Sequence, residues 1–290
     1  MSKTAPKIEF EGLRSKLKLK KLEAQNLFVE KYPQAFDVSN LRRRSSQLLG
    51  AGILTGTLFL AIPNVDLKSL PPPNQEVKNV EISSLTKSLS GILPDRVRPL
   101  THDEEKKVEQ ILQNNLNIKA KATLEGEHLN TTYGIIGAEQ HLARFPGDST
   151  NYHGQGIILR EGMAPGLGAW GYFASSKEKL TQDLEEKEKW YAVVQTLYLE
   201  SWNRRFPYLR DWYKYRKVLI VNTKNGNAVV ADVADSGPAA WTGKHFGGSP
   251  EVMQYLGGER YKKGSVLVFF VDDPENKIPL GPVYYNYKEI

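Results

Sequence analysis

The chain contains no cysteine among its 290 residues. This absence excludes disulfide frameworks, thiolate metal sites and cysteine nucleophiles, and it leaves the redox compartment open because a chain without thiols tolerates either side of a membrane. Apolar residues nevertheless make up 40% of the chain, including five Trp, fourteen Tyr and ten Phe. That content is enough for a packed core, so we expect at least one globular domain.

An excess of positive charge is also absent from most of the chain. Residues 1–47 hold eleven of the 39 Lys and Arg but only five of the 33 Asp and Glu, which leaves 28 residues of each sign beyond them. The net charge of +6 therefore belongs to the N-terminal segment. Because acidic and basic residues are equal in number beyond residue 47, a phosphate-binding surface is not expected there, and we expect no nucleic-acid partner.

One uncharged run is present, LLGAGILTGTLFLAIP from Leu48 to Pro63. Its roughly 16 residues fall short of the ~20 that a membrane-spanning helix needs. Residues 45–47 extend it, and the Arg44 side chain can reach the interface. The sequence therefore predicts a single transmembrane helix over residues 45–63, with a buried core helix as the alternative.

The flanking charges predict how this helix is oriented. Lys and Arg crowd before it, so the positive-inside rule places a basic tail, residues 1–44, in the cytoplasm and everything after Pro63 outside. The tail is longer than an ordinary signal-peptide n-region and no small-x-small cleavage site follows, so we expect an uncleaved, single-pass anchor in the cell membrane. Gly52 and Gly56 have the spacing of a helix-dimer motif, which allows a homodimer through the anchor.

Composition divides the rest of the chain at about residue 100. Residues 64–100 contain LPPPNQ, scattered Ser and Lys and few large apolar side chains, as is typical of a linker. Residues 101–290 carry the patterns of an extracytoplasmic α+β domain. Thr101 and Glu104 form a capping box that predicts a helix of about four turns.

Further elements are expected along this domain. A second capping box, at Ser175 and Glu178, predicts a long helix over residues 175–206 that Pro207 ends. Two β-rich runs joined by Asn225-Gly226 predict a hairpin with a two-residue turn, and SVLVFFVDD predicts a late strand. Strands with one inserted helix favour a small closed barrel with added α elements.

Residues 218–257, VLIVNTKNGNAVVADVADSGPAAWTGKHFGGSPEVMQYLG, follow a known pattern without a gap. The pattern is a strand, NxxNG, a second strand ending in Asp-Arg-Gly-Pro, then GRxIDLS and a helix ending in Leu-Gly. In these residues the chain resembles the rare-lipoprotein-A-like family, and GAWGYF, residues 168–173, looks like that family's first barrel strand. The resemblance implies a mainly β fold with added α, a six-stranded double-psi β-barrel over about residues 165–275 with the helical insert 175–206.

Two departures from the family pattern affect the site. Gly247 stands where the family has the Asp of IDLS, and Ser236 replaces the Arg of the Asp-Arg-Gly-Pro motif. The family's block between the first strand and the hairpin, which carries a Glu, an Asp and a His, is displaced by the predicted helix. The fold transfers more readily than the activity.

The resemblance implies that the partner is peptidoglycan. The family includes lytic transglycosylases, which cleave glycan strands, and members that only bind. Such cleavage needs one carboxyl group, which protonates the glycosidic oxygen and then takes a proton from the 6-hydroxyl of the sugar. Asp235 matches the family's functional Asp, and Trp241 and Phe246 beside it are expected to desolvate it and raise its pKa. The alternative is that Asp235 only caps a turn.

A second group of titratable residues lies in GAEQHLARFPGDSTNYHGQG, which contains Glu139, His141, Asp148 and His153. Glu139 is expected to supply the acid that the altered family block no longer provides. The spacing of His141 and Asp148 is that of zinc peptidases that cut wall peptides, but the downstream His-x-His pair is missing. We therefore expect a loop lining the groove, no metal site and no cofactor.

Aromatic and imidazole side chains are the candidate sugar contacts, because flat rings stack on sugars and ring nitrogens bond to hydroxyls. Asp232, on the opposite strand face from Val233, is expected to be solvated. The residues leave open a lytic enzyme, a glycan-binding module and a structural protein that dimerises through its anchor. The expected catalytic residues are Asp235 and Glu139, and the expected substrate contacts are Trp170, Tyr172, His141, His153, Trp241 and His245.

Overall fold

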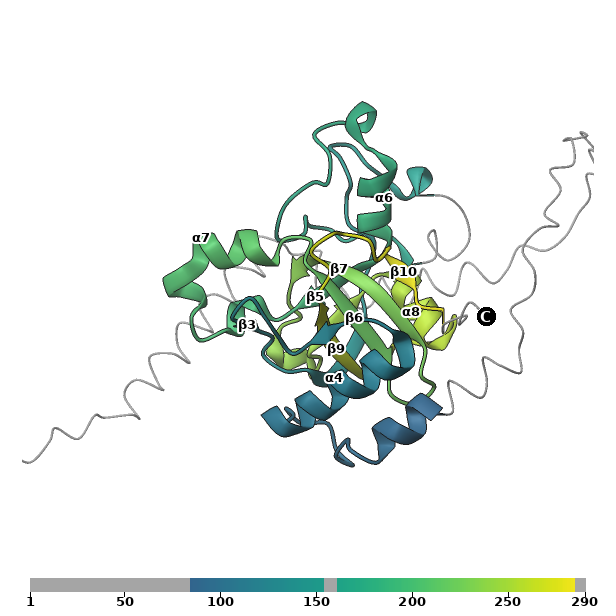
Figure 1. Ribbon diagram of the computed structural model, residues 1–290. Helices are drawn as coiled ribbons and strands as arrows, with labels where there is room; N and C mark the ends of the chain where they lie inside the picture. The colour runs from purple at the N-terminus through teal and green to yellow at the C-terminus, as the bar shows by residue number, and fades with distance from the viewer. Residues whose placement is uncertain (1–83, 154–160, 285–290) are drawn as a thin grey trace, which may run out of the picture. The chain divides into compact units, whose positions relative to one another are not determined.

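The computed structural model describes residues 84–153 and 161–284, and its centre is a closed β-barrel (Figure 1). Around the barrel the strands pair in the order β4, β9, β6, β7, β5 and β8, and β8 pairs with β4 to close the ring. The pairs β4/β8 and β5/β7 are parallel, and the other four are antiparallel. The six strands are β4 (Tyr133–Ala138), β5 (Tyr191–Val194), β6 (Lys217–Asn222), β7 (Ala228–Ser236), β8 (Phe246–Gly248) and β9 (Lys263–Val271).

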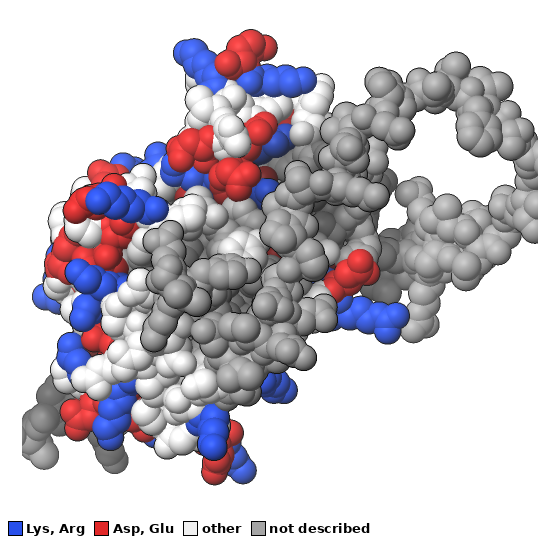
Figure 2. Space-filling view, turned by 45° about the vertical axis from the view of Figure 1, so that its right-hand side comes forward, with Lys and Arg blue, Asp and Glu red and all other residues white. Residues whose placement is uncertain are grey.

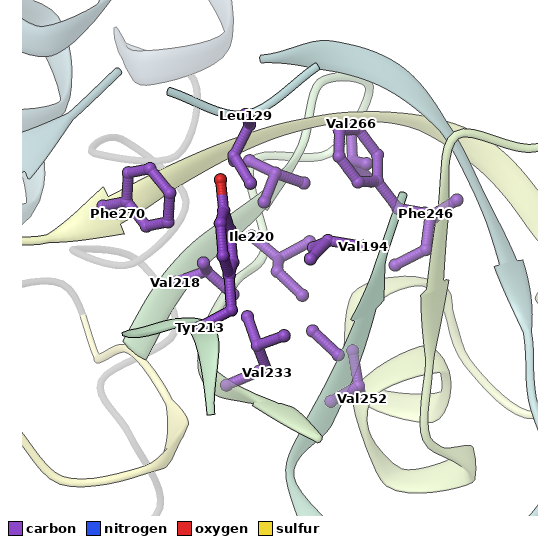
Figure 3. Close-up of a cluster of buried hydrophobic side chains, with 14 of the residues drawn as sticks. Leu129, Val194, Tyr213, Val218, Ile220, Val233, Phe246, Val252, Val266 and Phe270 are labelled. Carbon is purple, nitrogen blue, oxygen red and sulfur yellow. The ribbon is translucent and has the colours of Figure 1, made fainter. Parts of the chain in front are cut away.

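The barrel interior is filled by apolar side chains that alternate along the strands, as a period of two requires. On β6 the inward residues are Val218 and Ile220, and β7 and β9 contribute in the same way. Figure 3 shows these side chains converging from several strands. They are joined inside by Leu129, Val194, Tyr213, Val229, Ala231, Val233, Phe246, Val252, Val266, Val268 and Phe270, among others.

The outer face of β6, β7 and β9 is also apolar and forms a second core. Leu219, Val230 and Phe269 point outward there and are almost fully buried. The helix α4 (His102–Leu116) covers this face through residues such as Leu112 (Figure 1). Burial on both faces explains why these strands read as continuous hydrophobic runs.

The capping box predicted for α4 is confirmed. Thr101 accepts a hydrogen bond from the Glu104 amide, and the Glu104 carboxylate accepts one from the Thr101 amide. The short strand β1 (Ala120–Lys121) then pairs with the end of β9. The remaining small elements are β2 (Thr123–Leu124), β3 (Glu127–His128), β10 (Gly281–Pro282), and the 3-10 turns η2 (Thr150–Tyr152), η3 (Lys177–Lys179), η4 (Thr196–Tyr198) and η5 (Ala240–Thr242).

The predicted linker over residues 64–100 is too long at its C-terminal end. Residues 84–90 are helical, and Leu85 and Leu89 are buried in the same outer core as Leu112. Leu100 also belongs to this core. Residues 84–100 therefore contribute to the fold, because a few spaced leucines are enough to anchor a segment that is otherwise polar.

The long helix predicted over residues 175–206 is wrong. The segment contains η3, then α6 (Gln182–Lys189), then strand β5, then η4 and the start of α7 (Trp202–Tyr213). All four residues of β5 are buried between β7 and β8. Barrel closure needs this strand, and its long-range pairing overrides the helical spacing of the local sequence.

The predicted effect of Pro207 is wrong as well. It lies inside α7, and the helix is distorted just before it, at Arg205 (φ −119°, ψ 20°). The proline lacks an amide hydrogen and so bends the helix without ending it. The helix is retained because Trp202, Leu209 and Trp212 on one side of it are buried.

The first barrel strand was also placed wrongly. Residues 168–173 form a turn rather than a strand, with Gly171 at a φ of +77° and Gly168 packed tightly against the Ala234 carbonyl. The first barrel strand is β4, in a segment where no strand was predicted. The barrel therefore spans residues 133–271 rather than about 165–275.

The predicted hairpin is confirmed, with a longer loop than expected. Val221 pairs with Ala228, and the Asn222 amide donates to the Asn227 carbonyl, so the loop extends beyond Asn225 and Gly226. Gly226 adopts the left-handed conformation that the turn requires (φ +74°).

The asparagines of this hairpin close the end of another helix. The Nδ2 atoms of Asn222 and Asn225 donate to the Leu256 carbonyl at 2.9 and 2.8 Å, and Nδ2 of Asn227 donates to the Tyr255 carbonyl at 3.0 Å. These carbonyls lie in the last turn of α8 (Pro250–Gly257), where no intrahelical donor is left for them. The motif NTKNGN thereby fixes α8 against the barrel.

Charged side chains of both signs are intermixed on the face in Figure 2. Helix α6 carries the ion pairs Lys187–Asp183 and Lys189–Glu186. No helix within residues 84–153 and 161–284 is long and apolar enough to cross a membrane. The predicted anchor over residues 45–63 and the basic tail, residues 1–44, lie outside the described residues.

The asparagine clamp on α8 gives a first prediction. Replacing the buried Asn222 with Ala leaves the Leu256 carbonyl one donor short and is expected to lower the free energy of unfolding by about 1–3 kcal/mol. Chemical denaturation of the full-length chain measures this change. Lys224→Ala, at an exposed position of the same loop, is the matched control and should change it by no more than about 0.5 kcal/mol. Equal effects of the two substitutions would contradict the clamp.

Candidate functional site

Asp235 lies near the end of β7, where the strand leaves the barrel. Its Oδ1 atom accepts hydrogen bonds from the amides of Ala169 (2.7 Å) and Ser236 (2.8 Å). Burial raises the pKa of the Asp235 carboxyl above its ordinary value, while these two bonds act in the opposite direction. Among the described residues no hydrogen bond reaches Oδ2. One oxygen of the carboxyl is therefore held by the fold and the other is left for a ligand.

Glu139 follows β4 and lies over the position where the family pattern has an aspartate. A Cβ atom added to Gly247 would lie 2.5 Å from Cγ and 2.7 Å from Oε1 of Glu139. The backbone there is fixed, because the Glu139 amide donates to the Gly248 carbonyl at 3.0 Å. The glycine at 247 thus makes room for a carboxyl group that arrives from a different strand.

Asp235 and Glu139 belong to the same end of the barrel. Val193 on β5 pairs with Asp235 on one side and with Gly247 on the other, so the backbones of those two residues are about 10 Å apart, two strand spacings. The Glu139 side chain covers Gly247 from β4, the next strand around the ring. Asp235 therefore belongs to the strand on one side of β5, and the Glu139 carboxyl group lies over β8, the strand on its other side.

The charges at this end of the barrel interact. Burial raises the pKa of Glu139 most, Lys244 lowers it, and the negative charge of Asp235 raises it further. Nζ of Lys244 lies 3.3 Å from Oε1 of Glu139 and also donates to the Ala138 carbonyl. The arrangement can hold one carboxyl group protonated beside one that is paired with a cation.

The aromatic residues predicted to contact substrate have different surroundings. Trp241 is 88% exposed and Tyr172 is 39% exposed, so both rings can meet a ligand. Trp170 is packed against the barrel core and donates its Nε1–H to the Arg210 carbonyl. Trp241 is too exposed to desolvate Asp235, and Phe246, the other residue expected to do so, points into the barrel core.

Tyr198 was not identified as a site residue from the sequence, where it belonged to the apolar stripe of the predicted helix. In the structure it lies in η4, is 47% exposed, and its hydroxyl accepts a hydrogen bond from the Ala240 amide. This bond ties its ring to the turn that carries Trp241. The signal that could have found it is an aromatic residue near the end of a barrel strand, which required knowledge of β5.

His245 is more enclosed than a substrate contact requires. Its Nδ1 atom accepts a hydrogen bond from the Ile135 amide on β4, and burial lowers its pKa below the ordinary value. The ring also lines a small pocket with Leu129 and Thr131. Its main role in the structure is to join β4 to the turn before β8.

His141 and His153 are not at the surface, in contrast to their expected role as sugar contacts. Their side chains are 1% and 2% exposed and lie beside Glu188 at the end of α6. Nδ1 of His141 is 3.1 Å from Oε1 of Glu188, and Nδ1 of His153 is 3.3 Å from Oε2. Within the described residues these three side chains form a group whose donor atoms could hold a metal ion.

Asp148 is part of the same buried group. Its Oδ2 atom accepts hydrogen bonds from Nε of Arg144 (3.1 Å) and from the Arg144 amide, and it lies 2.9 Å from Nε2 of His153. These donors lower the pKa of Asp148 in spite of its burial, which acts to raise it. The segment that the sequence presented as a loop lining the groove is thus organised around an interior polar cluster.

Asp232 is buried, and the expectation of a solvated residue was wrong. It is 1% exposed, and neither carboxylate oxygen has a hydrogen-bond partner among the described residues. Asp232 does lie on the strand face opposite to Val233 and points away from the barrel interior. That outer face of β7, however, is covered by α6 and residues 276–280, which together with Asp232 line a pocket of about 670 Å³.

Burial raises the pKa of Asp232 well above its ordinary value. An unfolded Asp titrates near ~3.9, so ionisation costs the native state free energy as pH rises above ~4, by up to about 1.4 kcal/mol per pH unit. Asp232→Asn removes this titration. The melting temperature of the variant, relative to that of the unaltered chain, is therefore expected to rise between pH 4 and pH 7, as measured by differential scanning calorimetry.

Asp211→Asn is the control for this prediction, because Asp211 is largely exposed and paired with Arg210. Its melting temperature should follow that of the unaltered chain at every pH. A difference between Asp232→Asn and the unaltered chain that stays constant with pH would show that Asp232 is solvated and ionised in the native state.

Comparison with known proteins adds no relative. No family model, curated protein or solved structure matches the chain. The function must therefore be inferred from the site, in which Asp235 and Glu139 both have raised pKa values and Glu139 is paired with Lys244.

Proposed function

We propose that the chain is a membrane-anchored, extracytoplasmic double-psi β-barrel protein that cleaves the glycan strands of cell-wall peptidoglycan in the manner of a lytic transglycosylase. The ring of six strands with two parallel pairs, β4/β8 and β5/β7, is compatible with the double-psi arrangement. The anchor over residues 45–63 and the side of the membrane are part of the proposal, on the grounds of hydropathy and charge alone.

One observation carries the catalytic part of the proposal. Asp235 has a raised pKa and one oxygen without a hydrogen bond among the described residues, at the end of the barrel where Glu139 also lies. A general acid must be protonated near the working pH and must be able to reach its substrate. The raised pKa moves Asp235 toward the first requirement, and its second oxygen, without a hydrogen bond among the described residues, is open to a substrate. Glu139, by contrast, is paired with Lys244.

The proposed reaction uses Asp235 twice. The protonated carboxyl gives its proton to the glycosidic oxygen, and the bond from that oxygen to the anomeric carbon breaks. The resulting carboxylate then takes the proton from the 6-hydroxyl of the sugar that carries this anomeric carbon. As it does so, the oxygen of the 6-hydroxyl bonds to the anomeric carbon. The product is a 1,6-anhydro sugar, and Asp235 is protonated again. No water and no second carboxylate are consumed.

Glu139 and Lys244 are assigned to positioning. Their ion pair, half-buried beside Asp235, adds negative and positive groups that can bond to sugar hydroxyls and amides. Trp241, Tyr172 and Tyr198 supply exposed rings on which sugars can stack. Chain segments on both sides of β5 thereby contribute to one glycan-binding surface.

A second candidate is a glycan-binding module without catalysis. It is favoured by the two backbone amides that bond to Oδ1 of Asp235, because such bonds also describe a carboxylate that only holds a turn. In this case the same surface would bind peptidoglycan, and the substitution of Asp235 would change affinity modestly. The two candidates differ in whether soluble product is formed.

Incubation of the full-length chain, kept in detergent, with purified peptidoglycan distinguishes these candidates. Mass spectrometry of the soluble fraction should detect anhydro-muropeptides, and Asp235→Asn should lower their rate of formation by a factor of about 10²–10⁴. Because the pKa of Asp235 is raised, activity should persist at pH values above the ordinary pKa of an Asp. It should fall as pH rises through the raised pKa of Asp235. Asp211→Asn, at an exposed carboxylate outside the site, should retain full activity. Sedimentation with the wall and no product would leave the binding module.

A paired substitution tests whether Glu139 stands in for the missing aspartate. Glu139→Ala is expected to weaken activity or wall binding, and Gly247→Asp on that background restores a carboxyl group to the space that Glu139 vacates. The double variant should recover much of the loss. Gly247→Asp alone should be impaired, because the new side chain would overlap Glu139. If the double variant keeps its melting temperature but recovers no activity or binding, a carboxyl group at this place is not sufficient. Glu139 would then not stand in for the missing aspartate.

A further inference from the structure

We propose that His141, His153 and Glu188 bind one divalent transition-metal ion, for which zinc is the probe. The three side chains come from separate segments: the loop after β4, the turn after η2, and the last turn of α6. Their donor atoms lie within 4.8 Å of one another, and all three residues are buried. This site lies outside the proposed glycan surface and does not depend on the proposed function.

Two of the distances are close to those around a shared ion. In a tetrahedral zinc site with bonds of about 2.1 Å, neighbouring ligand atoms are about 3.4 Å apart. Nδ1 of His141 and of His153 lie 3.1 and 3.3 Å from the carboxylate oxygens of Glu188. Oε1 of Glu188 also accepts the Leu142 amide at 3.0 Å, and a carboxylate oxygen has lone pairs for both partners.

The other ring nitrogens support the same assignment. If both Nδ1 atoms bind an ion, both Nε2 atoms carry hydrogen. Nε2 of His153 then donates to Asp148, 2.9 Å away. Nε2 of His141 faces Oε1 of Glu251 at 4.0 Å, beyond hydrogen-bond distance. A carboxylate bonded to the far nitrogen of a ligating imidazole, as Asp148 is to His153, is the usual arrangement at protein metal sites, since it fixes the tautomer and the ring orientation.

Without a metal ion the cluster is held by hydrogen bonds alone. Both Nδ1 atoms must then donate to Glu188, and His153 must also donate from Nε2 to Asp148, so His153 is a buried cation. Within the described residues, Nε2 of His141 and Oε2 of Glu251 have no hydrogen-bond partner. Orphaned polar atoms in the interior are costly. A metal ion on Nδ1 of His141 would place a hydrogen on Nε2, on the side that faces the Glu251 carboxyl group.

Charge is compatible with a bound ion. Glu188, Asp148 and Glu251 carry three negative charges in the ionised state, and Arg144 supplies one positive charge among the buried members of the cluster. A divalent ion with two neutral imidazoles balances these charges, as would protonation of both imidazoles. The donor set of two imidazoles and a carboxylate suits zinc and its neighbours in the first transition row. Burial of all three ligands indicates a structural ion that joins α6 to the loop before η2.

This proposal departs from the sequence-based expectation of no metal. The spacing of His141 and Asp148 suggested a pair of ligands, but Asp148 has its oxygens engaged by Arg144 and orients His153 instead. Glu188, the ligand that completes the set, lies 47 residues beyond His141. It was hidden within the predicted long helix.

The test uses the full-length chain in detergent, stripped with a chelator, desalted and then supplied with zinc alone. Elemental analysis after a second desalting should find close to one zinc per chain, and zinc should raise the melting temperature. Cobalt as a substitute should give the visible absorption of a tetrahedral site. His153→Gln should abolish stoichiometric zinc and the rise in melting temperature.

His128→Gln is the matched control. His128 also pairs with a buried carboxylate, Glu105, at 3.0 Å, but no second histidine belongs to that pair in the described part of the chain. It should leave zinc binding unchanged. The proposal is overturned if the unaltered chain retains no zinc and shows no shift in melting temperature. This test does not depend on whether His153→Gln folds. Equal loss in His128→Gln would also overturn it. Neither result bears on glycan cleavage, which is measured separately.

Discussion

Closure of the barrel through β5 is the constraint on which the rest of the structure depends. This strand of four residues pairs in parallel with β7 and antiparallel with β8, and without it the ring has two free edges. Unpaired strand edges leave backbone amides and carbonyls without partners, so the fold places a strand where the local sequence favours a helix. Helix α6 lies in the connection that leads from β4 into β5, and α7 lies in the connection from β5 to β6.

The same strand brings the candidate catalytic groups together. Val193 at its centre lies between Asp235 and Gly247. The carboxyl group of Glu139 reaches over Gly247 from β4, a segment about 100 residues earlier in the chain. The space over Gly247 is thus occupied by a carboxyl group from a distant part of the sequence. This placement is possible only because position 247 has no side chain.

Buried polar groups distinguish two kinds of interior in this protein. Inside the barrel the contacts are almost wholly apolar. Outside it, α6 covers Asp232, whose carboxylate has no hydrogen-bond partner among the described residues. The same helix supplies Glu188 to a cluster of histidines and carboxylates. An aspartate without a partner is expected to be held neutral, whereas a cluster with several ionisable members can be balanced by an added cation. The two sites therefore call for different tests although they share one helix.

The sequence by itself determined the elements whose information is local. The capping box at Thr101, the hairpin through Asn225 and Gly226 and the apolar run of β9 were all predictable, because each depends on residues a few positions apart. The resemblance to a barrel family also pointed to a closed β-barrel and singled out Asp235. Only the tertiary structure decided that the strand at residues 191–194 interrupts a helical pattern, that Asp232 is buried, and that Glu188 meets His141 and His153. Those outcomes depend on pairing and burial between segments tens of residues apart, and the free energy of such contacts outweighs the local preferences on which sequence patterns report.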